Sequence, residues 1–458
     1  MHTSEPIASD LQIEQVEVRT LKPHPDNPRV HPKTQIRQIA ESIKAFGFRM
    51  PVVIDADGRL ICGHARIEAC KLIGMARVPA IRVTDLSESQ IRGLLIADNR
   101  LTEISNWDDT LLAQNLKVLS DLDLDFDIET IGFDYGEIEQ RILGLEGEVA
   151  SESDDEDGEI PDARTTPAVT RPGDLWILGE GDHAHRLICG DATDPTTYAR
   201  LLADRRAAMV FTDPPYNLSA RSIGQVCAAD HGDFAMGSGE MTPEEFTAFL
   251  GSVMTRLCEV SEPGSIHYLF MDWRHASEML TAGSEHYTEL KNMCVWVKDR
   301  PGMGTFYRSQ HELVFVFKHG AERHRNHFGL GEHGRTRSNV WSYPSVRSFD
   351  SADGDPEGDQ ALKLHPTIKP VRLIADAILD CSRRGEIVLD PFLGSGSTLI
   401  ACEKTGRICA GIELSPRYVD VAIARWQQLT GTNAIHEETG KGFNELAETR
   451  GGKEMSDA

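Results

Sequence analysis

The sequence predicts an α/β protein in which a large domain with a mainly parallel sheet follows a smaller N-terminal α+β domain. Two observations support this. Strand and helix patterns alternate in residues 16–83, and a strand, a glycine turn, a helix and a second strand follow one another in residues 385–414. Between them lies the segment 146–162, which holds nine acidic residues and no basic one. Because such a segment repels itself, it is typical of a solvated linker, and we expect two folded parts.

In the first part, short helices and strands alternate. Residues 36–46 have apolar side chains on one helical face, and a glycine follows that stops the helix. The segment 51–55 reads as a strand, and residues 59–73 read as a strand that enters a helix through a glycine. Ser87 with Gln90 forms a capping box for the next helix.

In the second part, a glycine turn joins two elements of the expected sheet. The segment 386–390 reads as a buried strand, and Ser397 and Thr398 open the helix after the turn. The next strand ends at Glu413, 23 residues after Asp390. This arrangement holds a nucleoside in doubly wound sheets, because glycines let the backbone approach the ligand and the carboxylate accepts ribose hydroxyls. The turn lacks the lysine of a P-loop and the third glycine of a dinucleotide fingerprint, which disfavours a triphosphate or NAD.

The segment FTDPPYN (211–217) ends another apolar strand. Proline has no amide hydrogen to give to a sheet and disfavours helix at the residue before it, so the chain leaves the strand along an extended, rigid path. That path fixes the Asp213 carboxylate, the Pro214 carbonyl and the Tyr216 ring at one point. A proline-stiffened loop without a function is the plain alternative.

The composition is that of a globular protein, with 40% hydrophobic residues and a formal net charge of −25. That charge argues against general nucleic-acid binding, so any DNA contact must be local. The nine cysteines include no CxxC pair, which suggests neither a zinc site nor a disulfide framework, and we expect a reducing cytoplasm. The N-terminus is too polar for a signal peptide and no apolar run reaches about 18 residues, so we expect no membrane partner.

Two motifs carry a resemblance to a known family. DPFLGSGST (390–398) with GIEL (411–414) resembles the S-adenosylmethionine motif of amino-type DNA methyltransferases, and DPPY (213–216) resembles their catalytic motif. LHPTIKPVRLI (364–374) is similar to the segment that these enzymes place before the glycine turn. The catalytic motif comes first, which matches the permuted order often called beta. The resemblance covers about residues 169–428 and implies a Rossmann-like methyltransferase domain.

The resemblance also implies the chemistry. An exocyclic base amine is a poor nucleophile because its lone pair is delocalised into the ring. Asp213 and the Pro214 carbonyl would accept its two hydrogens and favour the pyramidal form. Pro215 would keep the register, and Tyr216 would stack on a base flipped out of the duplex. No metal is needed. The residues expected around the S-adenosylmethionine cofactor are Asp191, Lys369, Asp390, Phe392, Gly394, Gly396, Ser397, Thr398 and Glu413.

The target base and the DNA contacts follow from the same resemblance. In this class an aspartate at the first motif position leans to adenine N6 and a serine to cytosine N4, so Asp213 favours adenine and leaves cytosine open. The basic segment 318–347 is the candidate for recognition of double-stranded DNA, with a solvated loop as the alternative. The arginines expected on DNA are Arg323, Arg325, Arg335 and Arg337.

Residues 12–105 resemble the ParB-like domain of partition proteins through NPRVH, PVVID and CGHARIEA. The resemblance implies that a nucleotide, CTP or ATP, binds by its phosphates at Gly63, His64 and Arg66. Partition proteins have glutamate and arginine where this chain has His64 and Ala65, which argues against hydrolysis. An ordinary glycine turn into a helix is the alternative.

These inferences define the expected organisation: a ParB-like domain with a helical segment (1–145), an acidic linker (146–168), a methyltransferase domain (169–432) with a recognition insert at about 318–360, and a polar, disordered tail (433–458). We expect a site-specific DNA adenine methyltransferase in the bacterial or phage-infected cytoplasm, associated with the nucleoid. The alternatives are a cytosine N4 enzyme and a nucleotide-gated DNA-binding protein whose methylase half is vestigial. The sequence leaves open whether the chain forms a homodimer and whether a restriction nuclease accompanies it.

Overall fold

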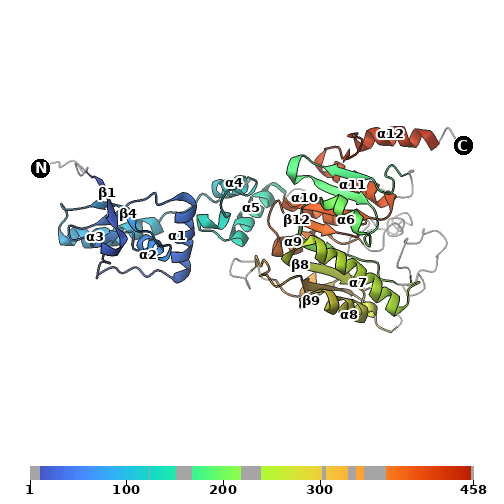
Figure 1. Cartoon of the computed structure of the whole chain (residues 1–458), viewed down its shortest axis with the longest axis horizontal. Helices are drawn as coiled ribbons and strands as arrows, with labels where there is room; N and C mark the ends of the chain where they lie inside the picture. Colours follow the sequence, from blue (N-terminus) through green and yellow to red (C-terminus); the bar gives the residue numbers. More distant parts are fainter. Residues whose placement is uncertain are drawn as a thin grey trace. The chain divides into compact units, whose positions relative to one another are not determined.

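The structure is a computed structural model, and its chain divides into two compact units, Met1–Ser151 and Glu152–Ala458 (Figure 1). The described residues are 11–122, 124–150, 168–217, 239–301, 306–328, 337–344 and 368–454.

The N-terminal unit contains a four-stranded sheet in the order β1-β4-β2-β3. Helix α1 ends at Gly47 and helix α2 begins after Gly63, where φ is 76° and 97°, values that glycine adopts without strain. The capping box of Ser87 and Gln90 opens α3. The predicted alternation of elements is thus present. The bounds are β1 Ile13–Glu17, α1 Lys33–Phe46, β2 Val52–Ile54, β3 Leu60–Cys62, α2 His64–Leu72, β4 Arg77–Arg82 and α3 Glu88–Glu103.

Two further helices, α4 (Asp109–Ser120) and α5 (Tyr135–Ala150), follow in this unit. They pack around a small apolar cluster that includes Leu116 and Ile138. Helix α5 therefore extends into the predicted acidic linker, of which residues 151–167 lie outside the described part.

The second unit is built on a ten-stranded sheet in the order β11-β9-β10-β8-β7-β12-β13-β6-β5-β14. The strand pairs β8–β7, β7–β12, β12–β13 and β13–β6 are parallel, while β10 is antiparallel to both of its neighbours. The predicted, mainly parallel sheet is confirmed. The bounds are β5 Leu175–Leu178, β6 His185–Cys189, β7 Ala207–Thr212, β8 Ser261–Met271, β9 Glu289–Val297, β10 His311–Lys318, β11 Val340–Ser342, β12 Ile387–Asp390, β13 Ile408–Glu413 and β14 Ile435–His436.

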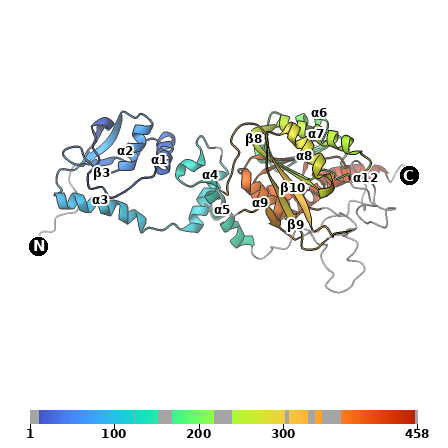
Figure 2. The same cartoon turned by 90° about the horizontal axis from the view of Figure 1, so that it is seen from below.

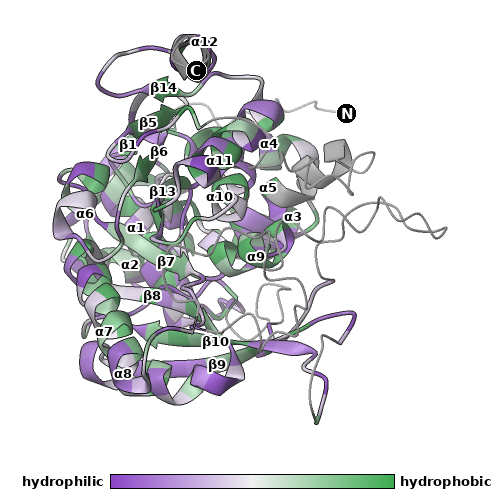
Figure 3. Cartoon of the chain, turned by 90° about the vertical axis from the view of Figure 1, so that its right-hand side faces the viewer, coloured by the Kyte–Doolittle hydropathy of each residue, from purple (hydrophilic) through white to green (hydrophobic). Residues whose placement is uncertain are grey.

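Helices cover both faces of this sheet (Figures 1 and 2). Met209 and Phe211 of β7 pack with the helices of one face, and Val210 packs with those of the other, as the two-residue period of a strand requires. Figure 3 shows the apolar colouring of strands β5, β6 and β13. The first face carries α9 Val371–Cys381, α10 Ser397–Thr405 and α11 Pro416–Thr430, and the second carries α6 Pro195–Leu202, α7 Pro243–Val260 and α8 Ala276–His286.

Two edges of the sheet matter for function. We call the edge where β7, β8, β12 and β13 end the carboxyl edge, and the edge where they begin the amino edge. Because β10 runs against β8 and β9, His311 lies opposite Val297, and the segment 298–310 leaves and re-enters the sheet at the carboxyl edge. Residues after Lys318 leave at the amino edge.

The C-terminal residues correct one expectation. We expected a polar, disordered tail, but β14 pairs with β5, and helix α12 (Phe443–Glu454) follows. Phe443 and Leu446 are buried, and the ring of Phe443 lies 5.2 Å from that of Trp176. The prediction was wrong because a few apolar side chains anchor a segment whose average composition is polar.

Among the described residues, no helix is long and apolar enough to cross a bilayer. The same residues contain no cluster of three or more His, Cys, Asp or Glu side chains that could hold a metal ion.

Candidate active site

The candidate site begins where β7 ends, at Thr212. Asp213 follows, with Pro214 buried and Pro215 half-buried. The motif ends at Asn217, which has a φ of 50°, a conformation that asparagine tolerates.

Asn217 anchors this loop to the chain that enters α7. Its Nδ2 donates to the Met241 carbonyl at 2.8 Å, and its Oδ1 accepts from the backbone N–H groups of Gly239 and Met241 at 3.1 and 3.2 Å. The prolines and this anchor fix Asp213 at the carboxyl edge.

Lys369 lies against Asp213, although 156 residues separate them in the sequence. Its ammonium group donates to Asp213 Oδ2 and lies 3.2 Å from Glu312 Oε2. The Lys369 side chain is only 5% exposed, and that of Asp213 is 23% exposed. We expected Lys369 near the cofactor motif, and the structure brings its ammonium group to the catalytic motif.

Three aromatic rings surround this ammonium group. Lys369 Nζ lies 5.0 Å from the ring centre of Phe270, 5.6 Å from that of Tyr216 and 5.9 Å from that of Trp296. Ring faces at these distances attract a cation. The rings also exclude water, which strengthens the pairing of Lys369 with its carboxylates.

Glu312 of β10 joins the members of this group. Its Oε2 accepts a hydrogen bond from Tyr216 Oη at 2.9 Å, and its Oε1 lies 2.5 Å from Lys298 Nζ. Two carboxylates and two ammonium groups therefore balance one another. A buried set of charges is tolerated when each member is paired in this way.

The pairing shows in the pKa values. Burial by itself would raise the pKa of Glu312, but Lys369 and Lys298 outweigh it and lower that pKa to about 2. Burial lowers the pKa of Lys369, and its two carboxylate partners raise it by more, so the group stays charged. Burial raises the pKa of Asp213 against the attraction of Lys369. Asp213 is thus the member whose pKa moves towards neutral pH.

One oxygen of Asp213 remains uncommitted. Oδ2 is held by Lys369, whereas Oδ1 is buried and has no hydrogen-bond partner among the residues that the structure describes. A buried acceptor without a partner is costly in a folded protein, and such atoms call for an explanation. A ligand that donates a hydrogen here would remove the cost.

Asp390 locks the glycine turn to the end of β7. Its Oδ1 accepts from Thr212 Oγ1 at 2.8 Å and from the Phe392 N–H at 3.1 Å, and its Oδ2 accepts from Thr398 Oγ1 at 2.6 Å. Burial raises its pKa to about 6 against these hydrogen bonds. Because both oxygens have partners inside the protein, Asp390 holds the two motifs in register.

Glu413 ends β13 beside the same turn. Its Oε2 accepts from the Gly394 N–H at 2.9 Å, and its Oε1 accepts from the Ser415 N–H at 2.8 Å. Burial raises its pKa to about 7, against these two backbone donors. A carboxylate offers about four acceptor positions, so two remain for further donors.

The two glycines of the turn serve different purposes. A Cβ added at Gly394 would meet no atom within 4 Å, so the space beside this residue is open. A Cβ at Gly396 would come within 2.7 Å of the Ala422 Cβ, so that glycine lets α10 and α11 pack closely. Only Gly394 borders space for a ligand.

The remaining predicted cofactor residues lie around this turn or end a neighbouring strand. Ser397 Oγ, at the start of α10, is buried without a hydrogen-bond partner in the described part of the chain. The Phe392 ring lies 6.2 Å from that of Phe249. Asp191 follows β6, and its Oδ1 accepts from the Thr193 backbone N–H at 2.7 Å. The structure thus brings both predicted motifs to one edge.

Two of the predicted DNA-contacting arginines lie at the other edge of the sheet. Arg323 and Arg325 follow β10 at the amino edge, and Arg325 pairs with Glu262 at 3.2 Å and with Glu386 at 2.6 Å. Both glutamates lie near the beginning of a parallel strand, opposite the end that carries Asp213.

Arg337 is likewise held inside the domain. Its Nε lies 2.9 Å from Asp380 Oδ2, and its Nη1 lies 3.0 Å from Tyr343 Oη. Burial would lower the pKa of Arg337, but Asp380 and its other partners raise it. Arg335, and most of the predicted insert, lie outside the described residues.

The predicted nucleotide site of the N-terminal unit has internal contacts of its own. Arg66 donates to the carbonyls of Met50 and Pro51, and His64 Nε2 accepts from the His24 N–H at 3.3 Å. A Cβ at Gly63 would lie 2.7 Å from Val52, so close packing explains this glycine. Nucleotide binding here stays a prediction.

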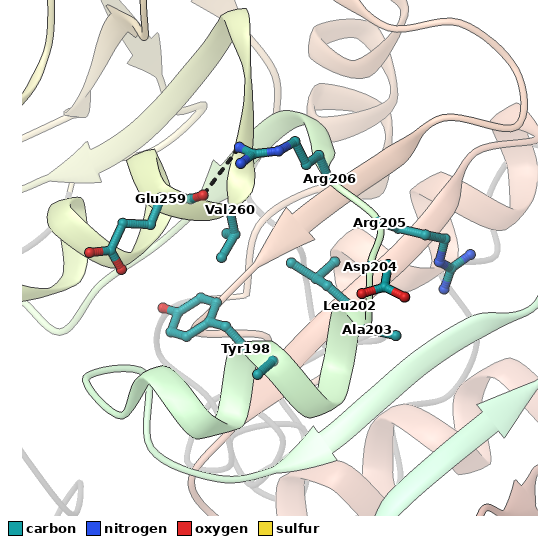
Figure 4. Close-up of a pocket in the computed structure, with 9 residues that line it drawn as sticks. Tyr198, Leu202, Ala203, Asp204, Arg205, Arg206, Glu259 and Val260 are labelled. Atoms are coloured by element: carbon teal, nitrogen blue, oxygen red, sulfur yellow. Dashed lines mark hydrogen bonds between the residues drawn. The ribbon is translucent and has the colours of Figure 1, made fainter.

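A separate pocket of about 170 Å³ lies at the amino edge (Figure 4). Tyr198, Leu202 and Val260 line it, and Arg206 donates to the Glu259 carbonyl at 3.1 Å beside it. It lies at the opposite edge from Asp213 and shares no residue with the candidate site.

Sequence reasoning missed two members of the site. Lys298 and Glu312 stand at facing ends of β9 and β10, in the segments VWVKD and SQHELVFVFKHG. The only sequence signal for these two residues is a charged side chain at the end of an apolar strand pattern. Such a side chain more often lies in solvent than in an active site.

Three family models match the chain, and one of them spans the predicted linker. Residues 207–424 match the family model of a DNA methylase, residues 110–172 that of a ParB-methyltransferase HTH domain, and residues 3–99 that of a ParB N-terminal domain.

Individual relatives cover the second part of the chain. The type II methyltransferase M2.DpnII of Streptococcus pneumoniae is 27% identical over 238 residues, which are 49% of this chain and 84% of the relative. The type II methyltransferase M.HpaI of Haemophilus parainfluenzae is 24% identical over 280 residues, which are 57% of this chain and 81% of that relative. The crystal structure of an M1.HpyAVI-SAM complex is 20% identical, with a TM-score of 0.37, and the match covers 52% of this chain and 97% of that one. The chain therefore contains a DNA methylase domain that matches the N6/N4 family model, joined to a ParB-like N-terminal domain.

Proposed function

We propose that this protein transfers a methyl group from S-adenosylmethionine to the exocyclic N6 amine of adenine in double-stranded DNA. One observation carries the proposal: Asp213 Oδ2 is held by the buried Lys369 ammonium, while Oδ1 is buried without a partner in the described part of the chain. A fixed carboxylate with one uncommitted acceptor suits an amine N–H donor.

In this proposal Asp213 Oδ1 and the Pro214 carbonyl accept the two amine hydrogens. The nitrogen lone pair then leaves conjugation with the ring and points away from the two acceptors, which stabilises the transition state more than the ground state. Lys369 prevents the carboxylate from rotating, so no reorganisation is needed when the amine arrives. As the nitrogen forms its new bond its N–H becomes acidic, and Asp213 is the adjacent base.

The glycine turn provides a fitting cradle for S-adenosylmethionine. The open space at Gly394, the free acceptor positions of Glu413 and the unpartnered Ser397 hydroxyl suit a ligand that carries ribose hydroxyls and an amino acid group. When bound, the cofactor supplies an electrophilic methyl group. Glu413 would hold the ribose, and Phe392 would lie against the cofactor.

The choice of base rests on Asp213, since an aspartate at this motif position favours adenine in the family that the chain resembles. Tyr216 would stack on the flipped base, and its hydroxyl bond to Glu312 keeps the ring from turning. Cytosine N4 remains the alternative because its amine presents the same two hydrogens. The bacterial cytoplasm is the expected location, where the DNA lies, and a homodimer and a nuclease partner stay predictions.

The test is to incubate the full chain with labelled S-adenosylmethionine and mixed-sequence duplex DNA, and to identify the labelled nucleoside after digestion. N6-methyladenine supports the proposal. N4-methylcytosine keeps the mechanism and overturns the choice of base. If calorimetry detects no binding of S-adenosylmethionine, the methylase half is vestigial and the proposal is wrong.

A further inference from the structure

The carboxyl edge carries an exposed group of aromatic side chains beyond the active site. Phe306 and Tyr307, just before β10, are 86% and 82% exposed, and their ring centres lie 4.5 Å apart. Trp273, which follows β8, is 52% exposed, and Arg274 lies over its ring at 5.0 Å. Burying rings of this size gives one of the largest hydrophobic gains in a protein, so leaving them in water points to a binding partner.

These side chains share one edge with Asp213. β8 and β10 are neighbours in the sheet, and Leu313 lies opposite Met271. The end of β8 and the start of β10 therefore meet at the carboxyl edge. Both strands are labelled in Figure 2. A partner of the active site would lie over both segments.

The same segments carry positive charge. Arg300 and Arg308 lie in the chain between β9 and β10, both are exposed, and neither forms an ion pair with another residue in the described ranges. Arg274 is paired with Asp272 at 3.0 Å. In a chain of net charge −25, two uncommitted arginines beside the active site favour an anionic partner such as DNA over a basic or neutral surface.

The arginines of the amino edge provide the contrast. Arg325 and Arg337 each have carboxylate partners, and Arg323, although exposed, lies at the edge opposite Asp213. A duplex whose target base reaches Asp213 would contact the carboxyl edge.

We propose that Phe306, Tyr307, Arg300 and Arg308 form a DNA-contacting surface, here called the aromatic-basic rim. The arginines would bind phosphates, and the two rings would stack on bases next to the flipped nucleotide, where stacking has been lost. The occupant is the duplex substrate itself, so this inference rests on the proposed function. It replaces the basic segment 318–347 as the expected location of the DNA contact.

The experiment measures binding of the full chain to a fluorescent mixed-sequence duplex as a function of salt, together with KM for DNA. The double variant Phe306→Leu/Tyr307→Leu keeps apolar bulk and loses stacking. It should weaken DNA binding about tenfold with an unchanged salt slope, since stacking releases no counterions.

A second double variant tests the charges. Arg300→Ala/Arg308→Ala should lower the magnitude of the salt slope by about 2, because each phosphate contact contributes about 0.9. Arg323→Ala is the matched control at the amino edge and should leave the slope unchanged. Calorimetry with S-adenosylmethionine checks that every variant is folded.

The outcomes separate this inference from the proposed function. If the wild-type chain labels no DNA, the proposed function fails. If the wild-type chain methylates DNA and both double variants bind it as tightly as the wild type does, the rim is not the DNA contact and the inference is wrong. A slope change in Arg323→Ala alone would return the contact to the amino edge.

Discussion

The two edges of the methylase sheet both hold buried charges, and they differ in what those charges leave free. At the amino edge, Arg337 and Asp380 pair with each other and with neighbouring side chains. At the carboxyl edge, Lys369 holds Asp213 by one oxygen and leaves the other without a partner among the described residues. At the amino edge, Arg337 Nη2 is also buried without a hydrogen-bond partner among the described residues, but it is a donor and lies at the edge opposite the glycine turn. Asp213 Oδ1 is an acceptor at the carboxyl edge, where a ligand could donate a hydrogen to it.

This difference provides a criterion that separates buried charged residues with a structural role from those with a functional role. Burial and an ion pair do not distinguish Arg337 from Lys369, since each has two acidic side chains within 4 Å. The distinguishing feature is the place of the uncommitted atom: Asp213 Oδ1 is an acceptor at the edge that also carries the glycine turn. Three pairs of substitutions test this distinction. In each pair, one residue lies at the carboxyl edge and the other at the amino edge.

The largest effect is expected for the two aspartates. Asp213→Ala should lower kcat/KM for DNA on the order of 10³-fold or beyond detection, because the amine loses its acceptor, and should keep S-adenosylmethionine binding. Its partner, Asp380→Asn, should lower the melting temperature and keep the activity. Methylation rates and calorimetry are measured on both variants. If Asp213→Ala still methylates DNA, Asp213 is not the acceptor for the amine.

A smaller effect is expected for the two cations. Lys369→Met should lower kcat/KM about 100-fold and move the acid limb of the pH–rate profile to higher pH. The sign follows from the charge: without Lys369, burial raises the Asp213 pKa unopposed by that ammonium group, and the ionised form required for activity appears only at higher pH.

The control for Lys369 is Arg337→Met, which removes one member of a buried ion pair. It should destabilise the fold by about 3 kcal/mol and leave the pH limb in place. The measurements are thermal unfolding and the pH–rate profile of each variant. If the acid limb of the profile moves by the same amount in both variants, Lys369 has a structural role only.

The smallest effect is expected for the two glutamates. Glu413→Gln should weaken S-adenosylmethionine binding about tenfold, which is the scale of a lost charge-assisted hydrogen bond. In the wild type, affinity should also fall as the pH drops through about 7, because the Glu413 carboxylate takes up a proton there. The variant should lack this dependence. Calorimetry between pH 6 and 8 measures it.

Glu386→Gln is the matched control at the amino edge. Burial raises the pKa of Glu386 as well, and Arg325 opposes that rise. This variant should bind the cofactor with wild-type affinity and pH dependence. Equal losses in both variants would trace the effect to stability and not to the ribose contact.

The features that the sequence determined by itself are local. The helix stop at Gly47, the capping box at Ser87, and the strand, turn and helix around Gly394 follow from residues within a few positions of one another. Propensities and capping act over that distance, so these elements could be predicted. The family followed from the same short motifs.

The tertiary structure decided which distant residues meet. Lys369 joins Asp213 across 156 positions, and Glu312 joins Tyr216 across 96. These contacts depend on strand order and on the antiparallel direction of β10 within a mainly parallel sheet. That direction also places Phe306 and Arg308 at the carboxyl edge and Arg325 at the amino edge, although all three flank one strand. The sequence pattern of a strand is the same in either direction, because its two-residue period has no polarity. Only pairing with neighbouring strands decided which end of β10 faces the substrate.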